Sequence, residues 1–215
     1  MTAPLRIACL HTVDSNIAVF EAASRGLNIV MSHNVRADLL SRSEAAGGLT
    51  AEIRDEAAAL LLGLAKDADA VLLTCSTVGP AAEQAAVSGA RVLRVDGALA
   101  SEAVALAAKG SKRVIALCAV QTTVEPTRAL FERAAAGSGV SIEMKIAPGA
   151  WDAFKSGDTP GYHRLVAAAA DDLYAGGADV IALAQASMAG GAALATRGTP
   201  LTSPAAGLAA AARRD

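Results

Sequence analysis

The sequence predicts an α/β protein of two pseudo-symmetric lobes, each a mainly parallel sheet flanked by helices. Short apolar runs typical of buried strands alternate with longer stretches of helical periodicity, a pattern that indicates parallel βαβ units. The composition is 53% hydrophobic but only 3% aromatic, and small apolar side chains let helices lie close against a parallel sheet. One strand-and-loop segment also recurs later in the chain, which predicts that the architecture is duplicated.

Apolar periodicity defines the elements of the first half. A polar turn after the first strand leads into a helix. A second, amphipathic helix is expected over residues 51–66, with Thr50 as its N-cap. Pro80 suits the first turn of the helix that follows the third strand. The expected strands of this half are residues 6–10, 27–31, 69–75 and 91–95.

The second half repeats this alternation of strands and helices. Its expected strands are residues 113–119 and 180–184, and its expected helices are residues 127–136 and 162–174. A chain of 215 residues is long enough to bury the apolar surface of two such lobes. We expect lobe 1 to comprise residues 1–97 with a C-terminal segment from about residue 198 to 215, and lobe 2 residues 98–197.

Two alignments within the chain indicate the duplication. Residues 68–79 align with residues 178–189, and residues 6–10 align with residues 114–118 at nearly the same offset. Any two α/β strands that end in polar loops look alike, but two matches at similar offsets favour duplication. Because loops at the carboxyl ends of strands hold ligands in open α/β sheets, we expect the active site in the cleft between the lobes. The first alignment places Cys75 on Gln185, so these two residues should flank one ligand.

Charge and composition exclude several classes of partner. The formal net charge is −2, and the 19 Lys and Arg residues are scattered rather than clustered with aromatics, so nucleic acid is excluded. The first residues do not resemble a signal peptide and no apolar run reaches membrane-spanning length, so we expect a cytoplasmic protein with no membrane partner. A small carboxylic acid is the expected partner, and homo-oligomerisation stays open.

Cys75 is the residue with the most distinctive chemistry. It follows an apolar strand and precedes a helix start, where backbone N–H groups lower the pKa of a thiol, so it could take a proton from a substrate. Ser76 and Thr77 add hydroxyls that suit a carboxylate and the enediolate formed beside it. Cys9 and Cys118 lie inside expected strands and are interpreted as small buried hydrophobes.

The histidines divide into one candidate and two structural residues. His11 ends the first strand, near Thr12 and Asn16, and could act as an acid–base or orienting group; a polar loop residue is the alternative. His33 is expected at the start of a polar loop and His163 on a surface helix, both in structural roles. No metal-ligand spacing and no nucleotide-binding glycine pattern is present, so we expect neither a metal nor a cofactor.

Thr122 and Thr123 follow the strand that heads the second half and precede the next helix. Their position predicts helix capping. Their hydroxyls could also contact a ligand from the same loop, because capping loops lie at the carboxyl end of a strand.

Five short motifs in this order resemble the aspartate/glutamate/hydantoin racemase superfamily over essentially the whole chain. This resemblance implies two similar α/β lobes with the active site between them, and racemases in which one cysteine from each lobe acts as acid or base without a cofactor. Cys75 matches the first of these cysteines, whereas Gln185 stands where the second is expected. His11 and Thr12 stand at the positions where glutamate racemases typically have an acidic residue and a serine, so the resemblance implies a different proton-transfer group here. The motifs are residues 74–80, 122–127, 149–158, 184–188 and 200–204.

The combined interpretation is a racemase or isomerase that works without pyridoxal phosphate or any other cofactor. We expect it to act at the carbon next to the carboxylate of a small acid, such as an amino acid or a hydantoin. Because glutamine cannot exchange a proton with carbon, two-base racemisation is in doubt. A non-catalytic carboxylate-binding protein, a single-cysteine decarboxylase and a cysteine nucleophile that forms a covalent adduct are the alternatives. The catalytic candidates are Cys75 and His11, and the substrate-binding candidates are Thr12, Asn16, Ser76, Thr77, Thr122, Thr123, Gln185, Ala186 and Ser187.

Overall fold

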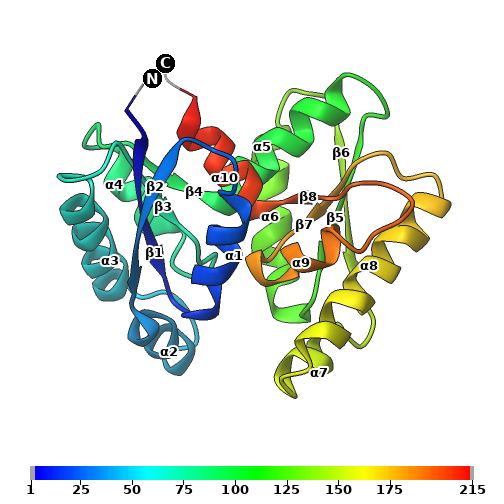
Figure 1. The fold of residues 1–215 in the computed structure, drawn as a ribbon, viewed down its shortest axis with the longest axis horizontal. Coiled ribbons are helices and arrows are strands. Elements are labelled where there is room, and N and C mark those ends of the chain that lie inside the picture. Colours follow the sequence, from blue (N-terminus) through cyan, green and yellow to red (C-terminus); the bar gives the residue numbers. More distant parts are fainter. Residues whose placement is uncertain (1–2, 214–215) are drawn as a thin grey trace. The chain divides into compact units, whose positions relative to one another are not determined.

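The computed structural model describes residues 3–213, which form two compact α/β units (Figure 1). Unit 1 comprises the chain up to Val95 and the segment from Gly207 onward, and unit 2 comprises Asp96–Ala206. No helix among the described residues is both long and apolar enough to cross a lipid bilayer.

Unit 1 contains a four-stranded parallel sheet in the order β2-β1-β3-β4. The chain runs from the central strand β1 outward to β2, and then returns to form β3 on the other side of β1. The C-terminal helix α10 adds to this unit, because an Arg91 amino group donates to the carbonyl of Ala210 at 3.4 Å. The elements are β1 (Leu5–His11), α1 (Ser15–Ala23), β2 (Ile29–Val35), α2 (Ala37–Ala45), α3 (Ala51–Leu64), β3 (Ala70–Leu73), α4 (Pro80–Ala86), β4 (Val92–Arg94) and α10 (Ser203–Ala212).

Unit 2 repeats this topology, with a parallel sheet in the order β6-β5-β7-β8. The fold class expected from the sequence is therefore confirmed: two four-stranded parallel sheets, each flanked by helices. The elements are α5 (Val95–Ala108), β5 (Arg113–Cys118), the 3₁₀ turn η1 (Gln121–Thr123), α6 (Val124–Ala135), β6 (Ser141–Ile146), α7 (Ala150–Lys155), α8 (Thr159–Ala175), β7 (Ile181–Leu183), the 3₁₀ turn η2 (Ala186–Met188), α9 (Ala189–Ala192) and β8 (Leu201–Thr202).

Strand alternation divides the side chains of the unit 1 sheet between two faces. Leu10 and Leu73 point to one face, where they join a core with Ile53 and Leu61 of α3. The Thr50 side chain accepts a hydrogen bond from the Ile53 amide at 3.3 Å, so the predicted N-cap of α3 is confirmed. The opposite face carries the residues that alternate with Leu10 and Leu73, and these include His11.

Unit 2 has a core on each face of its sheet. On one face Val114 and Ala116 of β5 pack with Leu99 of α5 and Phe131 of α6. On the other face the alternate strand residues pack with α8, where Tyr162 is almost fully buried. Both faces are therefore covered, as the high content of small apolar residues predicts.

The strands differ from their expected bounds in ways that matter for the site. β3 ends at Leu73, so Thr74 and Cys75 lie beyond the strand rather than within it. β2 continues to Val35, so His33 lies inside a strand and the expected polar loop at this position is wrong. Pro80 occupies the first turn of α4, as predicted. Two strands were not expected from the sequence, β6 and β8.

The hydrogen-bond ladders correct one of the two internal alignments. Leu10 pairs with Leu73 in unit 1, and Leu117 pairs with Leu183 in unit 2. The position equivalent to Cys118 is therefore His11, and not Leu10 as the sequence alignment suggested. The second alignment agrees with the ladders, because Cys75 and Gln185 each lie two residues after their strand ends.

One pair of substitutions on α5 tests the unit 2 core. Leu99 is fully buried whereas Leu106, on the same helix, is 48% exposed. We expect Leu99→Ala to destabilise unit 2 by about 2–5 kcal/mol, because it removes buried methylenes and leaves a cavity. Leu106→Ala should change the stability by less than about 0.5 kcal/mol. The chain's one tryptophan, Trp151, lies in unit 2, so its fluorescence during urea unfolding measures the effect; equal midpoints for the two variants would contradict this core.

Candidate functional site

The carboxyl ends of β1 and β3 meet at the point where the strand order of unit 1 reverses. The chain leaves β1 toward β2 on one side and later enters β3 on the other side. The Thr74 amide donates to the Leu10 carbonyl at 3.1 Å, which places the residues after β3 beside the end of β1. In open α/β sheets such reversal points are where ligands bind.

Cys75 lies at this reversal point and is half-buried. Its side chain packs against the core formed with α3 and α4. Ser76 is half-buried and Thr77 is exposed, and a turn closes behind them because the Gly79 amide donates to the Ser76 carbonyl at 3.1 Å. The thiol is thus held on a short loop at the sheet edge, with two hydroxyl residues directly after it.

His11 ends β1 and is completely buried. Its Nδ1 lies 2.8 Å from the Thr74 hydroxyl, and its Nε2 lies 2.9 Å from Nδ1 of His33. The ring also lies against Phe20 of α1, with centroids 5.5 Å apart. Both ring nitrogens therefore face protein groups, and the side chain orients the loop that carries Cys75 through its contact with Thr74.

A chain of side chains continues from His11 to the surface. His33 Nε2 pairs with the Glu21 carboxylate at 2.9 Å. Burial, and then the neighbouring His33, lower the pKa of His11 to about 4. His11 is consequently a neutral imidazole at neutral pH, with one ring nitrogen carrying a proton and the other a lone pair.

Thr12 and Asn16 are both buried beside this group. The Asn16 side-chain amide lies 3.5 Å from the Thr74 hydroxyl, the longest of the contacts to that oxygen. Thr74 itself donates to the Leu10 carbonyl at 3.2 Å. The structure thus brings His11 and Asn16 to the Thr74 hydroxyl and buries Thr12 directly after His11 in the chain. The contact of these three candidates with a substrate stays a prediction.

The reversal point of unit 2 lies between β5 and β7 and is closed by Gln185. The Gln185 side-chain oxygen accepts from the Ala119 amide at 2.9 Å, and its side-chain nitrogen donates to the Thr123 hydroxyl at 2.6 Å. One glutamine therefore ties the end of β7 to the loop that follows β5. Both polar atoms of this amide have protein partners, so its main observed role is to hold the loop.

Cys118 lies beneath this glutamine and is fully buried. Burial raises the pKa of its thiol and outweighs the lowering effect of hydrogen bonds with Thr123, Thr127 and Gln185. The interpretation of Cys118 as a buried residue agrees with this position, but the thiol has polar partners that the sequence did not predict.

The threonines before α6 do not cap it as expected. Thr123 occupies the N-cap position, yet its hydroxyl donates to the Val120 carbonyl at 2.9 Å and makes no side-chain capping bond. The backbone of Thr123 is already helical, with φ −89° and ψ −10°, whereas a residue whose side chain caps a helix is normally extended. Thr122 is exposed.

The η2 turn fixes the last two sequence-predicted residues, Ala186 and Ser187. Ala186 is buried, whereas Ser187 is half-buried with its hydroxyl 3.0 Å from the Tyr162 hydroxyl. The Ser187 carbonyl also accepts a hydrogen bond from His163 Nε2 at 3.1 Å. His163 therefore has a structural role in joining α8 to this turn.

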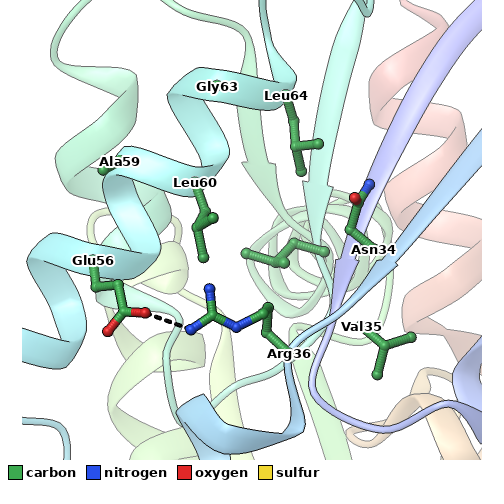
Figure 2. Close-up of a pocket in the computed structure, with 9 residues that line it drawn as sticks. Asn34, Val35, Arg36, Glu56, Ala59, Leu60, Gly63 and Leu64 are labelled. Atoms are coloured by element: carbon green, nitrogen blue, oxygen red, sulfur yellow. Dashed lines mark hydrogen bonds and ion pairs between the residues drawn. The ribbon is translucent and has the colours of Figure 1, made fainter.

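A pocket of about 490 Å³ lies on the α3 face of the unit 1 sheet, opposite the face that carries His11, and Cys75 is not among the residues that line it. Figure 2 shows Arg36 extending toward Glu56 of α3, with the apolar side chains of Leu60 and Leu64 above it in this view. Arg36 is bound by two carboxylates, those of Asp38 and Glu56. A negatively charged substrate would have to displace these carboxylates to reach the guanidinium, so this pocket fits a carboxylic acid poorly.

Known proteins share this fold although no protein-family profile matches the chain and no curated protein matches it by sequence. Glutamate racemase isoform RacE1 from Bacillus anthracis superposes with a TM-score of 0.60 at 13% identity, over 97% of this chain and 80% of that one. Glutamate racemase from Thermus thermophilus, solved with β-chloro-D-alanine, gives 0.60 at 16% identity, over 99% of this chain and 81% of that one.

A third solved structure is a variant of maleate isomerase from Pseudomonas putida, determined with maleate. It superposes with a TM-score of 0.60 at 12% identity, over 96% of this chain and 90% of that one. The chain therefore has the fold of the glutamate racemases and of maleate isomerase. This fold is consistent with the superfamily that the sequence motifs resemble.

Sequence reasoning missed three residues of the unit 1 cluster: Cys9, Glu21 and His33. Cys9 and His11 are two residues apart in a strand, so their side chains share one face of the sheet. His33 is the register partner of Cys9 in β2 and lies on that face as well. The spacing Cys9-x-His11 was a usable signal, but His33 and Glu21 could be found only from the strand pairing and the packing of α1.

The three cysteines should differ strongly in their rate of alkylation. Cys9 and Cys118 are fully buried. Burial, and then Glu21, raise the pKa of Cys9 to about 12, and burial also raises the pKa of Cys118. We expect iodoacetamide to modify the half-buried Cys75 at least about tenfold faster in the native protein, because the reactive species is an accessible thiolate. Peptide mass spectrometry after brief treatment measures this, and earlier labelling of Cys9 or Cys118 would contradict it.

Gln185 should protect the Ala119 amide. Gln185→Leu removes the acceptor of a buried N–H and should cost about 1–3 kcal/mol, which increases amide exchange at Ala119 by roughly 5- to 150-fold where exchange follows local opening. Gln185→Glu keeps an acceptor oxygen and is the matched control, with protection close to that of the wild type. Hydrogen exchange resolved to this amide measures both, and unchanged exchange in the leucine variant would show that Ala119 is held by other contacts.

Proposed function

We propose that this protein is a cofactor-independent racemase- or isomerase-type enzyme that acts at the carbon next to the carboxylate of a small acid. Cys75 is the acid–base group that exchanges a proton with this carbon. The substrate class is an amino acid, a hydantoin or a related acid.

The position of Cys75 is the observation that carries this proposal. It is the half-buried thiol at the carboxyl end of β3, whereas the other two cysteines are fully buried in strands. The solved structures that share the fold are named as glutamate racemases and a maleate isomerase, and these names indicate small carboxylic acids as substrates. A thiol at the reversal point of such a sheet is well placed for chemistry on a ligand bound there.

The neighbours of Cys75 supply polar groups of the kind that such a substrate needs. Ser76 and Thr77 follow directly, and their hydroxyls and amides can donate to a carboxylate and to the enediolate that forms as the proton leaves. His11 supports this loop as a positioning residue through Thr74, which is hydrogen-bonded to it at 2.8 Å. In unit 2 the candidates Thr122 and Ser187 remain proposed anion-binding groups.

Gln185 favours chemistry that uses a single thiol. It occupies the position in unit 2 that is equivalent to Cys75, and its amide does not titrate in the range where a general base must work. One-sided proton exchange, isomerisation or decarboxylation therefore suits this chain better than two-thiol racemisation. A non-catalytic carboxylate-binding protein is the second candidate, because the hydrogen bonds of Gln185 hold the unit 2 loop without any acid–base group of its own.

Solvent deuterium exchange tests the proposal across several substrate classes at once. Panels of amino acids, hydantoins, malonates and hydroxy acids are incubated with the protein in heavy water and analysed by NMR. We expect incorporation of deuterium next to the carboxylate of at least one class, and a loss of about 10²- to 10⁴-fold in Cys75→Ser, since a positioned acid–base group contributes roughly this factor.

Cys118→Ser is the matched control, because it removes a buried thiol from the equivalent sheet of unit 2. Exchange that survives in Cys75→Ser would refute the acid–base role of this residue. If the wild type binds a ligand but exchanges no proton in any substrate class, the protein would instead be the non-catalytic carboxylate-binding protein. A product lacking one carboxyl group would identify the decarboxylase.

A further inference from the structure

Cys9, His11 and His33 form a cluster in unit 1, and in the chemistry proposed for Cys75 only the Thr74-bonded nitrogen of His11 has a role. Their ligand-type atoms, one sulfur and two ring nitrogens, all lie within 4.8 Å of one another. We propose that this cluster is a binding site for a transition-metal cation of borderline softness, such as Zn²⁺, coordinated by Cys9 Sγ, His11 Nε2 and His33 Nδ1.

Sheet geometry explains why the three side chains converge. Cys9 and His11 are alternate residues of β1 and therefore point to the same face. His33 is the register partner of Cys9 in the neighbouring parallel strand β2, so it emerges on that face beside Cys9. Each residue is thus held by a hydrogen-bonded strand, and the ligand set is preorganised by the backbone.

The hydrogen bonds of His11 allow a tautomer whose ligand nitrogen carries no proton. The Thr74 hydroxyl lies 3.2 Å from the Leu10 carbonyl and 2.8 Å from His11 Nδ1, and it can donate its one hydrogen to either. When it donates to the carbonyl, it accepts from His11 Nδ1, and His11 Nε2 then carries a lone pair directed at His33 Nδ1, 2.9 Å away. Metal binding at Nε2 selects this tautomer.

His33 is also oriented by a hydrogen bond, which is made by its other ring nitrogen, Nε2. The Glu21 carboxylate can only accept, so His33 Nε2 carries the proton in this 2.9 Å contact. The lone pair of His33 Nδ1 is then directed at His11 Nε2, so a cation placed between these two nitrogens would be bound by both rings. A histidine whose far nitrogen donates to a carboxylate is the usual arrangement around bound zinc.

Small side-chain movements convert the cluster into a coordination site. Zinc bonds of about 2.0–2.3 Å hold tetrahedral ligand atoms roughly 3.3–3.8 Å apart. The sulfur lies within 4.8 Å of both nitrogens, so it needs to approach by about 1 Å at most, and the two nitrogens, now 2.9 Å apart, must separate by about half an ångström. The Cys9 thiol releases its proton to solvent as the metal–sulfur bond forms. A ligand set of one sulfur and two nitrogens suits Zn²⁺ and excludes Mg²⁺ and Ca²⁺, which prefer oxygen.

The cluster is reached from the side of α1. Cys9 and His11 are fully buried, but the His33 side chain is 12% exposed and the Glu21 side chain 56% exposed. A cation can therefore enter past Glu21, whose negative charge attracts it. Three protein ligands leave the fourth position for water or for the carboxylate of Glu21 after a rotation.

Cobalt titration tests the site on the full chain. The protein is stripped with a chelator, desalted and titrated with Co²⁺ alone. We expect one equivalent to bind with a thiolate-to-cobalt charge-transfer band in the near ultraviolet and the visible bands of a tetrahedral centre, and Zn²⁺ to displace it. Cys9→Ser should lose the charge-transfer band, His33→Gln should bind at least about tenfold more weakly, and Glu21→Gln should lose about 10- to 100-fold in affinity.

Cys118→Ser and His163→Gln are the matched controls, because they remove a cysteine and a histidine from unit 2, and both should retain the complete spectrum. Absence of a charge-transfer band in the wild type at millimolar Co²⁺, or its survival in Cys9→Ser, would overturn the proposal. If Cys9→Ser fails to fold, as judged by circular dichroism, the surface variant Glu21→Gln decides: an affinity equal to that of the wild type would refute the site. These readouts are independent of the chemistry proposed for Cys75.

Discussion

The central position of β1 is the constraint on which unit 1 depends. This strand pairs with β2 on one side and with β3 on the other, so its register determines which side chains from all three strands meet. Because side chains alternate along each strand, the apolar residues such as Leu10 go to the core under α3, and Cys9, His11 and His33 go together to the other face. A shift of β1 by one residue would turn Cys9 and His11 toward the core and Leu10 away from it, and the core would then contain an imidazole.

The two units share the same strand pairing but have different side chains at the ends of the paired strands. At the end of the central strand unit 1 has His11 and unit 2 has Cys118, and beyond the next strand unit 1 has Cys75 and unit 2 has Gln185. In unit 1 the histidine is hydrogen-bonded to Thr74 and the cysteine is left half-buried. In unit 2 the glutamine is bonded to the backbone and the cysteine is enclosed beneath it. Duplication thus conserves the positions while the burial of each side chain determines what it can do.

Local patterns predicted most of the fold because the elements with strong signals are those that bury apolar faces. The helix behind Thr50, the turn at Pro80 and the strand before Cys75 all have such signals. The strand β6 does not, since its residues 141–146 include charged side chains and are largely exposed. His33 was misplaced for a related reason: β2 becomes polar after Met31, yet its pairing with β1 continues to Val35. Clusters that form across strands depend on this pairing, which a local pattern does not contain.

The return of the chain to unit 1 after Gly207 has a consequence for synthesis. Arg91 bonds to the Ala210 carbonyl, and Gly207 lies so close to Val95 that a side chain there would collide with it. The ribosome therefore releases every residue of unit 2 before the last helix of unit 1 is available. Since compact units generally fold as wholes, unit 1 is completed only after all of unit 2 has been synthesised, and Val95 stays without its contact to Gly207 until then.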